Sequence, residues 1–281
     1  IYDRVKETKE EVSELKANYA ALVSMVDEYF GKLLDYFDNN NLWEDTALIL
    51  TTDHGFLLGE HDWWAKNRMP VYNEISHIPL MIYHPGHSKL SGSRIESLTQ
   101  TIDIMPTFLD LFNLNIPNDV SGKSLLNILQ SDQQIRKALI YGYFGAACNI
   151  TDGKHTYFRY PKKMSASGLH EYTLMPTRMT SRFSIRELSE MTLSNPFKFS
   201  KGLQLLKVKP KVSENNEPLE VQGMTFEDIG SQLFDVSIDK EQKFPIDDPE
   251  VIKFLLEEMV KLMKQADAPK ELFERLNLKC N

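Results

Sequence analysis

The sequence predicts an α/β fold: a mostly parallel sheet with flanking helices, followed by a smaller C-terminal antiparallel sheet with a packed helix. Three patterns predict it. Apolar residues recur every three or four positions from Val12 to Phe37, which is typical of an amphipathic helix. A continuous apolar run at residues 47–50 is typical of a strand buried on both faces of a parallel sheet. After about residue 136, short mixed runs separated by turn residues indicate antiparallel strands.

Composition limits the class of protein. The chain has 281 residues and a net charge of -8, which argues against non-specific nucleic-acid binding because that needs a basic face. Cys148 and Cys280 are too few for a disulfide framework and fit no zinc spacing. The sequence contains no run of about 18 apolar residues, so we expect no membrane span. It starts at Ile1 without a signal-peptide pattern, so we expect a chain that begins mid-protein.

The elements of the first expected domain, residues 1–135, follow from local signals. Three asparagines at 39–41 end the first helix, which then leads into the apolar strand as in an α/β unit. A second short strand is expected at 78–83, where Pro-Gly ends it. A helix follows at about 104–112, with Asp103 as its expected cap.

The second expected domain, residues 136–281, is less regular. Strands are expected at 139–141, 156–158 and 232–236. An amphipathic helix opened by Asp248 and Pro249 follows. Residues 160–225 show no pattern that predicts an element.

The residues with the clearest chemistry follow the apolar strand. Asp53 and His54 stand where that strand ends and Gly55 opens a turn. An adjacent carboxylate and imidazole at such a point can face one divalent cation. Lys66, thirteen positions later, can return over the same place as a fixed positive charge. A cation and a lysine together offset the charge that develops when an anionic ester reacts.

The chain resembles the sulfatase family of the alkaline phosphatase superfamily, in matching order over about two thirds of its length. The motifs that carry the resemblance are Asp45-Thr46-Ala47-Leu48-Ile49-Leu50-Thr51-Thr52-Asp53-His54-Gly55, Leu58-Gly59-Glu60-His61 with Lys66, His77-Ile78-Pro79-Leu80, Asp103-Ile104-Met105-Pro106-Thr107, Gly122-Lys123-Ser124-Leu125-Leu126 and Leu233-Phe234-Asp235-Val236.

This resemblance implies an alkaline-phosphatase-like fold and the hydrolysis of sulfate monoesters. It implies that Asp53 and His54 bind a divalent metal, normally Ca²⁺, and that Lys66 contacts the sulfate group. The family's nucleophile is a formylglycine matured from a Cys/Ser-x-Pro-x-Arg motif, and this sequence contains no such motif. The resemblance therefore implies a C-terminal portion whose partners are an N-terminal half carrying that motif and a small sulfated substrate.

Two alternatives remain open at this point. One is a phosphodiesterase or phosphonate hydrolase of the same superfamily, which shares Asp-His-Gly; the other is a non-catalytic module that kept the fold. His61 is expected to brace the loop more than to touch substrate, and Trp63 and Trp64 fit a pocket wall or a packing anchor equally well. A run of lysines after residue 197 favours a solvated face over an anion site. Its members are Lys198, Lys201, Lys207, Lys209 and Lys211.

Overall fold

A computed structural model describes residues 4–66, 69–87, 90–162, 168–175, 177–178, 181–209 and 230–279. These residues form two compact units. Unit 1 comprises residues 1–97, 126–134 and 241–243. Unit 2 comprises residues 98–125, 135–240 and 244–281. The chain enters unit 2 at residue 98, leaves it at 126 and enters it again at 135.

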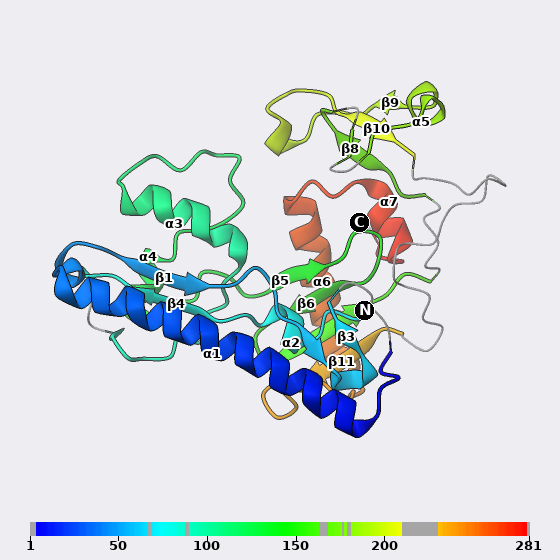
Figure 1. The fold of residues 1–281 in the computed structure, drawn as a ribbon. Coiled ribbons are helices and arrows are strands. Elements are labelled where there is room, and N and C mark those ends of the chain that lie inside the picture. Colours follow the sequence, from blue (N-terminus) through cyan, green and yellow to red (C-terminus); the bar gives the residue numbers. More distant parts are fainter. Residues whose placement is uncertain are drawn as a thin grey trace. The chain divides into compact units, whose positions relative to one another are not determined.

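Helix α1, Lys9–Asn39, is the long N-terminal helix of unit 1 (Figure 1). A capping box begins it: the Thr8 hydroxyl accepts a hydrogen bond from the Glu11 amide, and the Glu11 carboxylate accepts one from the Thr8 amide. The helix ends at the predicted asparagines, and Asn41 adopts a left-handed φ of 55°. Nine large apolar or aromatic side chains of α1 are exposed within this chain. They are Leu15, Tyr19, Leu22, Val23, Met25, Val26, Tyr29, Leu33 and Tyr36.

Strand β1, Leu48–Thr51, pairs with β4, Leu80–Tyr83, in a two-stranded antiparallel sheet. The prediction that β1 has a parallel neighbour is wrong for the described residues. All four β1 residues are half-buried, so the predicted burial on both faces is also not observed within this chain. An apolar run indicates that a strand tends to be buried, but it does not specify the direction of the neighbouring strand.

The connection between the two strands explains their antiparallel pairing. The connecting segment leaves β1 and enters β4 at the same end of the sheet, so that Thr51 pairs with Leu80. A parallel partner would require a crossover to the opposite end. This connection contains the hairpin of β2, Leu57–Leu58, and β3, Trp64–Ala65, followed by the short helix α2, Asn73–Ser76. Turns of 3-10 helix lie at Leu42–Glu44, before β1, and at Glu60–Asp62, and helix α4, Leu126–Ser131, also belongs to unit 1.

The core of unit 2 is a four-stranded antiparallel sheet in the order β11-β7-β6-β5. The strands are β5, Leu139–Gly142; β6, Cys148–Thr151; β7, His155–Arg159; and β11, Gln232–Asp235. Helix α6, Pro249–Gln265, packs on it: Leu255, Met259 and Met263 join Ile150 and Leu233 in one buried cluster. The predicted antiparallel sheet with a packed helix is confirmed.

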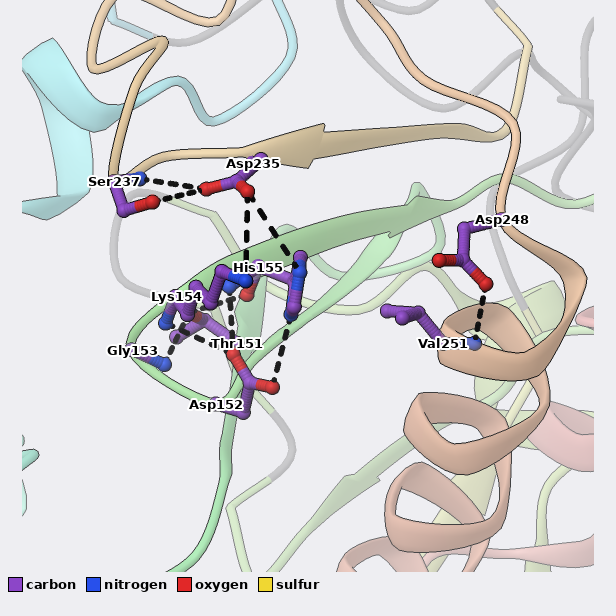
Figure 2. Close-up of polar contacts among 9 residues, drawn as sticks. All are labelled: Thr151, Asp152, Gly153, Lys154, His155, Asp235, Ser237, Asp248 and Val251. Carbon is purple, nitrogen blue, oxygen red and sulfur yellow. Dashed lines mark hydrogen bonds and ion pairs between the residues drawn. The ribbon is translucent and has the colours of Figure 1, made fainter.

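Hydrogen bonds from backbone amides to two Asp side chains fix the ends of these elements (Figure 2). In the turn between β6 and β7, the Asp152 carboxylate accepts hydrogen bonds from the Lys154 and His155 amides. The His155 ring then lies between two carboxylates, 3.2 Å from Asp152 and 4.0 Å from Asp235. At the start of α6, the Asp248 carboxylate accepts from the Glu250 and Val251 amides at 3.1 Å, which is the predicted cap.

Helix α3, Ile104–Leu111, follows a turn of 3-10 helix at Thr101–Asp103. The prediction that the Asp103 side chain caps α3 is wrong. It accepts instead from the Gln100 amide of the preceding turn and from the Lys123 amide. Its carboxylate is fully buried, and the guanidinium of Arg136 provides the compensating charge, which a helix N-terminus alone does not provide.

Residues 160–225, where the sequence predicted no element, contain a second sheet of unit 2. Its order is β8-β10-β9, formed by Glu171–Thr173, Leu206–Val208 and Thr192–Leu193. The short helix α5, Ile185–Ser189, and a 3-10 turn, Lys198–Ser200, complete it. Helix α7, Lys270–Arg275, follows α6 near the C-terminus. No helix among the residues described above has the length and apolar character that a membrane span needs.

Candidate functional site

The candidate site lies at the C-terminal end of β1, where Asp53 and His54 follow the strand. Gly55 is required here because the chain passes close to α2. Its amide donates to the Ile75 carbonyl at 2.8 Å, and a Cβ at this position would lie 1.8 Å from the Glu74 carbonyl oxygen. Any larger residue would push the turn away from α2 and move both site residues. The glycine of the motif therefore holds the turn in place.

Asp53, His54 and Lys66 come together in the structure. The His54 Nε2 atom lies 3.2 Å from Asp53 Oδ2, and the Lys66 ammonium contacts the same ring nitrogen. The other ring nitrogen, Nδ1, lies 3.0 Å from the Gly55 carbonyl oxygen. Because a carbonyl can accept only, Nδ1 carries the hydrogen of this bond. Nε2 is therefore the atom that His54 presents to Lys66 or to a cation.

The charges around Asp53 favour its ionised form. Desolvation of the carboxyl raises its pKa, but the neighbouring His54, the His54 amide and Lys66 together outweigh this, so that the pKa lies below its ordinary value. The His54 amide donates to Asp53 Oδ1 at 2.9 Å, which leaves lone pairs of both oxygens available. The Asp53 side chain is 79% exposed, so an ion can reach it from solvent.

These side chains fit part of a cation site. A carboxylate and the Nε2 atom of an imidazole, 3.2 Å apart, can contact one divalent ion. Within the described ranges no third His, Cys, Asp or Glu joins them. Calcium prefers six to eight oxygen ligands, so most of its ligands would have to come from other groups.

The loop that returns Lys66 to the site has a strained backbone. His61, Asp62 and Ala65 have φ values of 55°, 64° and 78°, a region that residues with a side chain rarely adopt. Such conformations persist only where surrounding contacts hold them, and they cluster at functional sites. The contacts here include an antiparallel pairing of Leu57 with Ala65 directly before Lys66.

His61 holds this loop against α2. Its ring stacks on Tyr72, with centroids 3.6 Å apart and planes 3° from parallel. Its Nε2 lies 3.5 Å from a carboxylate oxygen of Glu74, and both atoms are buried. The ring is 8% exposed, which fits bracing of the loop and leaves it little access to a substrate. No pattern in the sequence identified Glu74 as its neighbour.

The two tryptophans of the loop are packing anchors. Trp63 and Trp64 are buried; Arg4 lies over the Trp63 ring at 4.2 Å, and the Trp64 indole donates to Glu7 at 2.7 Å. They tie the loop to the segment before α1, because Val5 also donates its amide to the Asp62 carbonyl.

Solved structures show the same fold. A structure described as a complex with its substrate D-glucosamine-2-N,6-O-disulfate matches 89% of this chain and 40% of that chain, with a TM-score of 0.53 and 20% identity. Another, from work on glycosaminoglycan metabolism by Bacteroides thetaiotaomicron, matches 91% and 44%, with a TM-score of 0.58 and 20% identity. These likenesses show an alkaline-phosphatase-like fold.

Two sulfatase family models match overlapping parts of the chain. The family model described as Sulfatase matches residues 2–114, which include Asp53, His54 and Lys66. The model described as N-sulphoglucosamine sulphohydrolase, C-terminal, matches residues 59–174. The resemblance based on the motifs is thereby confirmed.

Individual relatives agree with this assignment. An N-acetylglucosamine-6-O-sulfatase of Bacteroides thetaiotaomicron is 28% identical over 221 residues, covering 74% of this chain and 38% of that protein. The multifunctional alkaline phosphatase superfamily protein PehA of Trinickia caryophylli is 35% identical over 120 residues, which cover 42% of this chain and 23% of that protein. Arylsulfatase K of Gallus gallus is 34% identical over 122 residues, which cover 43% of this chain and 22% of that protein. The chain spans less than half the length of each of these relatives. Sulfatases as a family use a metal and a formylglycine.

Proposed function

We propose that this chain supplies the Asp53–His54–Lys66 part of the active site of a sulfatase that hydrolyses sulfate monoesters. The observation that carries the proposal is the convergence of these three side chains at the end of β1. The carboxylate and the imidazole can hold a divalent cation beside the Lys66 ammonium group. A cation and a lysine offset the negative charge that develops on an anionic ester, since fixed charges act on a transition state only when they point at it.

Each residue has a distinct role in this proposal. Asp53 and His54 Nε2 hold the divalent cation, with Ca²⁺ as the expected metal. When bound, the cation neutralises charge on the sulfate oxygens. Lys66 places a second positive charge beside them. Lys66 contacts the nitrogen that His54 would offer to a cation, so Lys66 and a cation would compete for one lone pair.

The formylglycine nucleophile belongs, in this proposal, to an N-terminal sulfatase portion that covers the apolar side of α1. Two features support such a partner. Nine large apolar or aromatic side chains are exposed along α1, more than a free surface helix needs. The chain also aligns with 38% of the Bacteroides relative. A complementary sulfatase portion would bury that side of α1 and supply the missing ligands.

Two substitutions test the assignment in a polypeptide where this chain follows an N-terminal sulfatase portion carrying Cys/Ser-x-Pro-x-Arg. Asp53→Ala should abolish both metal binding and sulfate ester hydrolysis. Lys66→Ala should retain the metal, measured by elemental analysis, and lose about 100-fold or more in kcat, the usual effect of removing one preorganised charge. Normal turnover by Lys66→Ala would remove Lys66 from the mechanism.

A second candidate is the hydrolysis of phosphodiesters or phosphonate esters at the same residues. PehA, the multifunctional superfamily protein that is 35% identical over 120 residues, favours it. The same polypeptide assayed with 4-nitrophenyl sulfate and with bis-4-nitrophenyl phosphate separates the two, because a sulfatase should prefer the sulfate ester in kcat/KM. If the completed polypeptide bound no divalent cation, that result would favour the third alternative, a non-catalytic module that kept the fold.

A further inference from the structure

A second polar region lies in unit 2 and uses none of the residues proposed above. It is a groove of about 860 Å³ between the small β8-β10-β9 sheet and the end of α6 with α7. Its volume lies in the range of ligand pockets. The residues used below are Tyr172 and Phe197 with Lys198, Lys207, Lys264 and Lys270. We call this region the lysine-aromatic groove.

The charge of the groove is opposite to that of the chain. Four lysines line it against two carboxylates, Asp267 and Glu271, whereas the whole chain has a net charge of -8. Glu271 is occupied by its neighbours: Lys207 lies 3.4 Å away, His170 lies 3.2 Å away, and the Tyr172 hydroxyl donates to it. Its negative charge is therefore largely compensated within the wall.

The lysines at the mouth of the groove are exposed. The Lys198 side chain is 72% exposed and stands 4.0 Å from Asp267, at the limit of an ion pair. The Lys270 side chain is 83% exposed and pairs at 3.2 Å with Glu274, itself well exposed. Exposed pairs of this kind contribute little to stability, so an anionic ligand can replace them at small cost.

Aromatic rings form the other part of the surface. Tyr172 and Phe197 meet edge to face with centroids 5.1 Å apart, and Phe199 stacks on Phe197 at 5.2 Å. Phe199 is 57% exposed, whereas the groove-lining rings of Tyr172 and Phe197 are half-buried. Lys207 lies 5.6 Å over the Tyr172 ring, which joins the positive charge to the aromatic surface. The apolar face of a sugar ring packs on such a surface while its charged substituents reach the lysines.

We propose that the lysine-aromatic groove binds a sulfated oligosaccharide. The choice of a carbohydrate as the ligand rests on the proposed function. A sulfatase that also binds a polymeric substrate outside its active site would keep that substrate bound between successive reactions. Of the lysines after residue 197, Lys198 and Lys207 line the groove. The side chains of Lys198, Lys201 and Lys209 are 72%, 72% and 62% exposed, as expected for a solvated face. The competing ligand is an acidic peptide, which would use the lysines but not the rings of Tyr172 and Phe197.

The test measures binding to the 281-residue chain by titration calorimetry in 150 mM salt. The probes are a fully sulfated glucosamine–uronate tetrasaccharide, the same tetrasaccharide after desulfation, and hexaglutamate. The groove variants are Lys198→Ala/Lys264→Ala and Phe197→Leu. The matched control is Lys253→Ala/Lys261→Ala, which removes the same charge from α6 positions outside the groove lining. Circular dichroism confirms that every variant is folded.

We expect the sulfated tetrasaccharide to bind, with the double lysine variant weakening its Kd about tenfold, as two charge contacts imply. Phe197→Leu should weaken it several-fold, while the control and Asp53→Ala bind as the unmodified chain does. Equal loss in the control would show diffuse attraction and overturn the proposal. Equal binding of the desulfated sugar, or tighter binding of hexaglutamate, would also overturn it. Loss of binding in Asp53→Ala would place the sugar at the end of β1 instead. Groove binding without sulfate ester hydrolysis in the completed polypeptide would refute the proposed function alone.

Discussion

Asp103 and Arg136 form a bidentate ion pair in which both N···O distances are 2.6 Å and the carboxylate is fully buried. The same carboxylate accepts from the Gln100 and Lys123 amides. Gly122 lets Lys123 approach, because a Cβ there would lie 1.9 Å from the Ile102 carbonyl oxygen. One buried charge thus joins three segments of unit 2 that are distant in sequence.

Arg136→Ala should therefore destabilise unit 2 by about 3–5 kcal/mol, because it leaves the Asp103 carboxylate buried without its counter-ion. Urea unfolding followed by circular dichroism measures the change in the free energy of unfolding. Arg182→Ala, at an exposed arginine, is the control and should stay within about 0.5 kcal/mol of the unmodified chain. A loss below about 1 kcal/mol for Arg136→Ala would mean that Asp103 has another source of compensation.

Asp248→Ala should lower the stability by about 1 kcal/mol, since it removes the side-chain acceptor for two amides at the start of α6. Figure 2 shows this cap at Val251. Asp248→Asn should retain most of the effect, because an amide oxygen also accepts. Asp247→Ala, next to the cap and without these contacts, is the matched control in thermal unfolding. Equal effects of the Asp247 and Asp248 changes would argue against the cap.

Glu187 should make stability depend on acid pH. Desolvation raises its pKa, but hydrogen bonds from Arg178 and from Ser184 outweigh this and lower the pKa from 4.5 to about 2. A carboxyl with a lowered folded pKa stabilises the fold above its unfolded value, and this contribution is lost as pH falls from about 4.5 towards 2. The stability difference between the unmodified chain and Glu187→Gln should be constant above pH 5 and shrink below 4.5.

The apolar side of α1 should matter for assembly and little for the fold of this chain. Leu22 and Val26 are 58% and 59% exposed, so Leu22→Glu/Val26→Glu should change the unfolding free energy of this chain by less than about 1 kcal/mol. In the completed polypeptide the same pair should abolish activity, because two carboxylates would be buried without partners. Ser24→Glu, at a polar position of the same helix, is the control. Full activity of the double variant would show that this side of α1 stays uncovered.

The 281 residues alone should not hydrolyse aryl sulfates even with calcium, because they contain no Cys/Ser-x-Pro-x-Arg motif. Release of 4-nitrophenol from 4-nitrophenyl sulfate measures this against a calcium-only blank. Turnover well above that blank would show that the chain has a nucleophile of its own and would contradict our assignment of roles.

Several elements followed from the sequence because their determinants are local. The period of apolar residues predicted α1 and α6, and Asp248 predicted the start of α6, because a cap and a helical face depend on residues within a few positions. The order of the motifs predicted the resemblance to sulfatases, which two family models confirm. It also placed Asp53 and His54 next to each other at a strand end, where the backbone by itself holds them together.

The tertiary structure alone decided the rest, because those contacts join residues far apart in the chain. It paired β1 antiparallel with β4, which an apolar run cannot specify. It moved Asp103 from a helix cap to a buried ion pair whose partner lies 33 residues away. It built the β8-β10-β9 sheet from short segments that show no periodicity of their own, and with it the groove where Lys198 and Lys207 meet. Burial and charge compensation set these contacts, and both depend on neighbours that only the folded chain brings together.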